Sequence, residues 1–101
     1  MANSELVIDL RGRCIGTLED FWDAVAEPCG LPDWFGRNLD AWADALESGG
    51  VAEILDRYDT LTVRVGRRGL FAGENAGGRA LAEVFDGERH RLVVHPPADR
   101  A

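Results

Sequence analysis

The chain has three short strand-like segments separated by segments of helical periodicity, and this order constrains its fold more than any other feature. Strands are expected at residues 5–10 (ELVIDL), at 61–65, where apolar residues alternate with Thr and Arg, and at 92–94, a buried strand closed by two prolines. Strands connected through helices need crossovers, which place neighbouring strands parallel. We therefore predict an α/β domain in which a three-stranded, mostly parallel sheet packs with about four helices.

Capping residues mark the start of the first two helices. Thr17 and Asp20 have the spacing of a capping box, and apolar residues follow at helical spacing until Pro28. This pattern predicts a helix over residues 18–27. Asn38 is the expected N-cap of a second helix.

The remaining helical segments are bounded by glycine. The second helix is expected to run to about Ser48 and to stop at the Gly-Gly pair 49–50. Residues 51–57 predict a brief third helix, and apolar residues line one helical face over 80–85. A loop rich in Gly and Arg is expected over 66–73.

The length of the chain, 101 residues, is that of one domain. We expect this domain to cover residues 1–97, with 98–101 as a frayed tail. The N-terminal segment has no basic leader before a long apolar run, and no segment approaches the roughly 18 apolar residues that span a bilayer. We therefore expect a cytoplasmic protein that does not associate with membranes.

The charge of the chain is negative and unevenly distributed. It has 18 Asp and Glu against 11 Lys and Arg, a net charge of -7, which favours cationic partners and disfavours direct binding of nucleic acid. Residues 31–60 contain seven acidic and two basic side chains, or -5 of that total. The negative field is therefore expected around the second helix.

The second helix has an apolar and an acidic stripe: Leu39, Trp42 and Leu46 on one side, and Asp40, Asp44 and Glu47 on the other. Like charges four residues apart on a helix destabilise it by a few tenths of a kcal/mol. Asp40 and Asp44 therefore do not stabilise the helix, and a cationic partner would explain their placement.

Two adjacent aromatic residues, Trp34 and Phe35, interrupt the loop before this helix. Aromatic side chains beside matched charges are typical of a binding hot spot. The alternative is that both rings belong to the core and the acids form a solvated helix face. The composition alone leaves both interpretations open.

Residues 31–44, with the sequence LPDWFGRNLDAWAD, resemble the signature of the barstar family. In that signature a Leu-Pro pair, two aromatic residues, a glycine and Asn-Leu-Asp-Ala open the inhibitory helix. The resemblance implies that the loop and second helix plug the active site of a barnase-like or related guanyl-preferring ribonuclease. The acids would then replace the phosphate of the substrate.

The resemblance also implies roles for single residues. Asp44 matches the aspartate that family members place in the phosphate site, against the arginines and catalytic histidine of the enzyme. Asp40 matches a second interface acid, and Trp34 matches an interface aromatic. The expected partner-contacting residues are Trp34, Phe35, Gly36, Asn38, Asp40, Ala43, Asp44, Glu47, Ser48, Asp86 and Glu88.

The chain departs from the family pattern at three places. Ala43 stands where the better-known family member has an interface tryptophan, and Trp42 occupies the preceding position, expected in the core. Residues 48–50 (SGG) replace a glycine followed by bulky residues. A shortened segment before the last strand leaves Asp86 and Glu88 as candidates for the family's last interface glutamate. These departures bear on the identity of the target more than on the inhibitory class.

Enzyme and metal-binding functions find no support in the sequence. It has no GxSxG, Walker or HExxH pattern and no paired His and Cys, so we expect no enzyme activity and no cofactor. Asp40 and Asp44 without further ligands make a poor divalent-cation site. Cys14 and Cys29 indicate neither a disulfide framework nor a zinc site.

The expected partner is a cationic extracellular ribonuclease, bound in a 1:1 complex by a protein that is a monomer when free. The alternative is a barstar-fold immunity protein directed at a toxin of another chemistry. Either partner would be basic.

Overall fold

Three parallel strands form one sheet in the computed structural model, which describes residues 4–47, 52–72, 75–85 and 87–96. The strands β1 (Glu5–Asp9), β2 (Thr60–Gly66) and β3 (His90–His95) lie in the order β1-β2-β3, so β2 is central. Both pairs of neighbouring strands are parallel, as predicted from the crossover connections between them.

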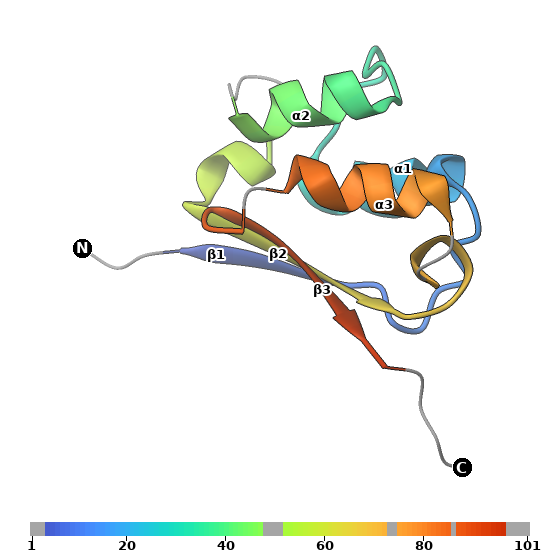
Figure 1. Cartoon of the computed structure of the whole chain (residues 1–101). Helices are drawn as coiled ribbons and strands as arrows, with labels where there is room; N and C mark the ends of the chain where they lie inside the picture. Colours follow the sequence, from blue (N-terminus) through green and yellow to red (C-terminus); the bar gives the residue numbers. More distant parts are fainter. Residues whose placement is uncertain (1–3, 48–51, 73–74, 86, 97–101) are drawn as a thin grey trace.

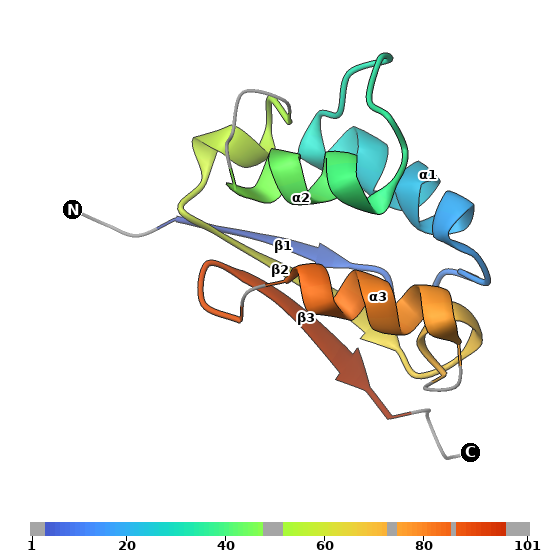
Figure 2. The same ribbon diagram turned by 45° about the horizontal axis from the view of Figure 1, so that its top comes forward.

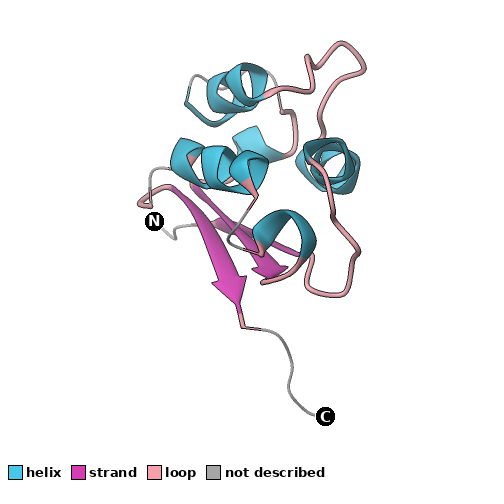
Figure 3. Cartoon of the chain, turned by 45° about the vertical axis from the view of Figure 1, so that its right-hand side comes forward, coloured by secondary structure: helices cyan, strands magenta, loops and turns pink. Residues whose placement is uncertain are grey.

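Three α-helices cover the same face of this sheet (Figures 1 and 3). They are α1 (Leu18–Cys29), α2 (Leu39–Glu47) and α3 (Ala76–Val84). Two short 3-10 helices, η1 (Leu55–Arg57) and η2 (Gly69–Phe71), flank β2. Among the described residues no helix covers the opposite face of the sheet.

The predicted brief helix over 51–57 is reduced to the single 3-10 turn η1 within its described residues. The predicted stop at 49–50 and the expected tail at 98–101 lie outside the described residues. The α/β class is confirmed, and the described residues contain three α-helices where about four helices were predicted.

Helix α1 extends one residue beyond Pro28, where the sequence predicted an end before the proline. The proline lies in the last turn, so its missing N–H removes only one hydrogen bond near the helix end. Gly30 then adopts a left-handed conformation with φ of 73°, and its N–H donates to the Glu27 carbonyl. The N–H of Leu31 donates to the Ala26 carbonyl, which completes a Schellman motif.

The core lies between the helices and the sheet. Phe21 contacts Trp22 and Trp42 edge-on, with ring centroids 5.4 and 5.6 Å apart, and all three side chains are buried. On the sheet side, the core is completed by alternate residues of β2, which are Leu61, Val63 and Val65. Strand β2 is central, so its apolar side chains are covered completely.

Strand β3 was predicted to be a buried strand, and the structure differs. It is an edge strand, and most of its residues are half-buried or exposed, with Val94 38% exposed. Its apolar run of Leu92, Val93 and Val94 is equally compatible with a buried or an edge position, because the sequence pattern carries no information on strand order.

Candidate functional site

The two adjacent aromatic residues of the loop between α1 and α2 point to different environments. Phe35 is 7% exposed, and its ring lies 5.8 Å from that of Trp22. Trp34 is 71% exposed. The ring of Phe35 is therefore part of the core and anchors the loop, as the alternative interpretation predicted for it. The contact of Phe35 with a partner stays a prediction. Trp34 remains available on the surface.

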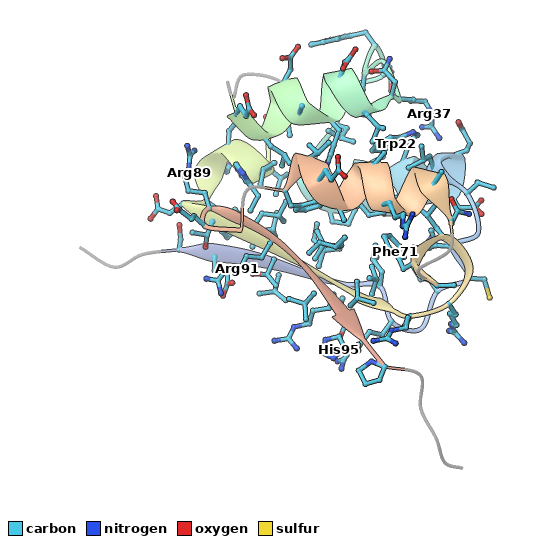
Figure 4. The ribbon with its side chains drawn as sticks, viewed as in Figure 1. Trp22, Arg37, Phe71, Arg89, Arg91 and His95 are labelled. Atoms are coloured by element: carbon cyan, nitrogen blue, oxygen red, sulfur yellow. The ribbon has the colours of Figure 1, made fainter. Side chains whose placement is uncertain are left out.

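Arg37 holds this loop against α1 (Figure 4). Its Nε donates to Glu19 Oε2 at 2.8 Å, and its Nη2 lies 2.6 Å from Asp23 Oδ1. These hydrogen bonds with Asp23 and Glu19 raise the pKa of the Arg37 guanidinium. The backbone of Arg37 has φ of 53°, an uncommon conformation for a residue with a side chain. The two carboxylates therefore hold a strained loop in one position.

Arg37 is one of the two basic side chains of residues 31–60, and its role in holding the loop was not predicted. A signal was present in the sequence, because Glu19 and Asp23 are spaced four residues apart on α1 and repel each other unless a cation lies between them. The sequence does not say which arginine supplies that cation.

The start of α2 is built by Asn38, as the sequence predicted. Its Oδ1 accepts the N–H of Ala41 at 2.7 Å, and its Nδ2 donates to the Gly36 carbonyl at 3.2 Å. Four residues into the helix, Trp42 is fully buried against Phe21, Trp22 and Phe85. The cap and the buried tryptophan together fix the rotation of α2 about its axis.

That rotation presents the acidic stripe of α2 to solvent. Asp40, Asp44 and Glu47 are exposed, and none makes an ion pair within the part of the chain that the structure describes. Ala43 lies between them and is half-buried. We group these four residues with the exposed Trp34, Gly36 and Asn38 of the preceding loop under the name α2 face: Trp34, Gly36, Asn38, Asp40, Ala43, Asp44 and Glu47.

The remaining predicted contact residues are less completely placed. Ser48 and Asp86 lie outside the described residues. Glu88 is exposed just before β3. Its neighbour Arg89 shares a pocket of about 210 Å³ with Glu47 and Tyr58. The start of β3 therefore adjoins the C-terminal end of α2, on the side where Glu88 is expected to act.

The described residues contain no group of three or more His, Cys, Asp or Glu side chains that could hold a metal ion. Cys14 is exposed and Cys29 is buried, and both are free thiols. Burial raises the pKa of the Cys29 thiol to about 12. Within the described segments no helix has the length and apolar character needed to cross a membrane.

Comparison with known proteins gives one family. Residues 5–89 match the family model described as Barstar (barnase inhibitor). This match covers most of the chain, including all of the α2 face. The comparison with curated proteins gives no match.

Proposed function

Since the chain belongs to the barstar (barnase inhibitor) family, whose members inhibit barnase-like ribonucleases, we propose that it blocks the active site of a small secreted guanyl-specific ribonuclease with its α2 face. The complex has one copy of each protein. The inhibitor acts in the cytoplasm of the cell that makes the enzyme, before export.

The observation that carries this proposal is a comparison within the molecule. Glu19 and Asp23, four residues apart on α1, hold the guanidinium of Arg37 at 2.6 Å. Asp40 and Asp44 have the same spacing on α2 and are exposed without a cation among the described residues. A carboxylate pair of this spacing therefore binds a guanidinium in this fold, and the pair on α2 is open to one from a partner.

A ribonuclease active site offers such cations, because it must bind the phosphates of RNA. We expect Asp44, in the middle of the helix, to occupy the phosphate position, with Asp40 and Glu47 at its sides. Charged hydrogen bonds removed from water are stronger than those on an open surface. The acids thus mimic the substrate without offering a bond to cleave.

The support beneath the α2 face favours tight binding. Arg37 holds the loop, Asn38 caps the helix and Trp42 fixes its rotation. A surface ordered in advance loses less conformational entropy on association. Trp34, 71% exposed on the loop before α2, is an aromatic side chain available for contact.

The net charge of the protein also accelerates the encounter. A charge of -7, with acids concentrated on one face, attracts a cationic enzyme over long distances. Salt screens this attraction, so the association rate should fall as ionic strength rises.

The proposal is tested by titrating the protein into a guanyl-specific microbial ribonuclease and following RNA cleavage at low and moderate salt. We expect cleavage to stop at one equivalent and association to slow with salt. The matched variants are Asp44→Asn, which should inhibit far less, and Glu27→Gln, which removes the same charge from α1 and should inhibit normally. Equal inhibition by both variants, or none by the parent across several such enzymes, would refute the proposal and favour a toxin of another chemistry.

A further inference from the structure

The outer edge of β3 carries backbone groups without hydrogen-bond partners. Leu61 N–H donates to the Arg89 carbonyl and Arg67 N–H donates to the His95 carbonyl, which fixes the parallel ladder between β2 and β3. In such a ladder alternate residues direct both backbone groups to the neighbouring strand, and the others direct theirs away. The N–H and carbonyl groups of Leu92 and Val94 therefore face outward, and no described residue binds them.

Helix α3 lies alongside β3 (Figure 2). Two pockets lined by residues of both elements form an apolar groove beside this edge. One part is a pocket of about 140 Å³ with an almost wholly apolar lining that includes Leu70, Ala82 and Val94. A second pocket continues along β3 past Leu92 to Phe85. The groove is thus the continuation of the core surface, left uncovered because the sheet ends at β3.

The wall of this groove depends on a close approach of α3 to η2. A Cβ atom at Gly78 would lie 1.9 Å from the Leu70 carbonyl oxygen, so only glycine permits the contact. Asn75 caps α3 at the same end by accepting the N–H groups of Gly77 and Gly78. The groove is therefore a fixed feature of the fold.

Two basic side chains flank this edge. Arg79 lines the pocket, and Arg91 projects from β3 on the sheet face away from the helices, as does His95 (Figure 4). Arg64 of β2 lies on the same face as Arg91, but Asp9 of β1 is its register partner on the other side. Neither Arg79 nor Arg91 makes an ion pair within the described ranges, although the protein as a whole carries a net charge of -7.

From these observations we infer that β3 is a second docking site, which binds an extended acidic segment of a partner protein as a fourth strand. Side chains of a strand alternate between the two faces of a sheet. Apolar residues of the segment would enter the groove beside Leu92 and Val94, and acidic residues would lie on the other face beside Arg91. Its backbone would pair with the free groups of β3.

A second copy of the chain fits this edge less well. A two-fold pairing of β3 with β3 centred on Val93 satisfies all four free groups and places Arg91 opposite His95 of the other copy. It brings Arg64 and Arg91 of both copies to one face of the joined sheet and supplies no acidic side chain to Arg91. An acidic segment supplies such a side chain.

The site lies apart from the α2 face. Val94, Leu70 and Gly78 are at the N-terminal end of α3, whereas Glu88 and the C-terminal end of α2 adjoin the start of β3. The docking of a segment on β3 is therefore compatible with a ribonuclease on α2.

The experiment uses a blocked, fluorescein-labelled heptapeptide of alternating Glu and Val residues, with fluorescence anisotropy and amide hydrogen exchange as readouts. We expect saturable binding that slows exchange at Leu92 and Val94. The control peptides replace every Glu with Lys or carry N-methyl groups on every residue. Binding of either control as tightly as the first peptide would overturn the inference, as would the absence of binding.

Two variants test the two kinds of contact. Val94→Pro removes an outward N–H without breaking the bonds between β2 and β3, and Arg91→Glu reverses the charge; each should weaken binding by about tenfold. Arg91→Glu should also prefer the Lys peptide, a result that does not depend on whether Val94→Pro folds. Ribonuclease inhibition by both folded variants should equal that of the parent. Concentration-dependent protection of Leu92 and Val94 in the protein alone would identify a second copy as the occupant and overturn the inference.

Discussion

Helices α1 and α2 begin alike, but their acidic side chains differ in their partners. Each starts at a capped turn, buries a tryptophan and carries two carboxylates four residues apart. On α1 the acids act within the chain, since Asp20 closes a capping box with Thr17 while Glu19 and Asp23 hold Arg37. On α2, Asp40, Asp44 and Glu47 have no such partners among the described residues.

This difference shows which acidic surface is available to a partner. Counting charges does not distinguish the two helices, because both are acidic. What distinguishes them is whether the chain supplies the counter-charge. Carboxylates bound to Arg37 would have to lose that partner before binding another, whereas those of α2 lose only water.

The largest effect is expected when the two aromatic residues of the loop, Phe35 and Trp34, are substituted one at a time. Phe35→Ala should lower the free energy of unfolding by about 3–5 kcal/mol, because it leaves a cavity beside Trp22 in the core. Trp34→Ala should leave stability unchanged and weaken ribonuclease binding. Urea unfolding and inhibition assays measure the two quantities, and a loss of stability in Trp34→Ala would return Trp34 to a structural role.

The second expected effect is the loss of affinity in Asp44→Ala, on the order of 2–5 kcal/mol, because the cationic site of the enzyme would be left desolvated and unpaired. Stability should rise by about 0.2–0.5 kcal/mol, since a like-charge pair on α2 is removed. Calorimetric titration and thermal unfolding report on the two changes. If the affinity of Asp44→Ala for ribonuclease were unchanged, the acids of α2 would differ from those of α1 in charge pairing but would have no role in binding.

A smaller effect is expected from Arg37→Gln, which removes the cation that α1 holds. Glu19 and Asp23 are largely exposed, so stability should fall only slightly. The loop before α2 should become more mobile and the affinity for ribonuclease should fall, with no change in the contacts themselves. Amide exchange at 33–38 tests this, and unaltered exchange would show that Phe35 alone anchors the loop.

The effect that is smallest at neutral pH concerns Cys29 at the end of α1, because it appears only at alkaline pH. Burial raises the pKa of its thiol from 9.0 to about 12. The unfolded chain therefore loses this proton first, so the stability contributed by the neutral thiol is full below pH 9 and declines as pH rises toward 12. Unfolding between pH 8 and 11 should show a steeper decline for the parent than for Cys29→Ala, and parallel curves would contradict the assignment.

The site was predictable to the extent that it depends on helical periodicity. The spacing of Trp42 against Asp40 and Asp44 placed one side chain inside and two outside, and the structure agrees. The same reasoning could not tell which of Trp34 and Phe35 is buried, because the side chains of neighbouring loop residues do not alternate regularly between core and solvent. The edge position of β3 was also hidden, since strand order depends on contacts between distant segments.

The parallel α/β class, the caps at Thr17 and Asn38, and the acidic stripe of α2 could be predicted, because these depend on local spacing and on crossover geometry. Which acids remain open to a partner depends on the folded structure. Arg37 reaches Asp23 and Glu19 across 14 and 18 residues, and it does so only because the folded loop lies against α1. Charge pairing over such separations is a property of the folded chain, since nothing in the spacing of the residues specifies it.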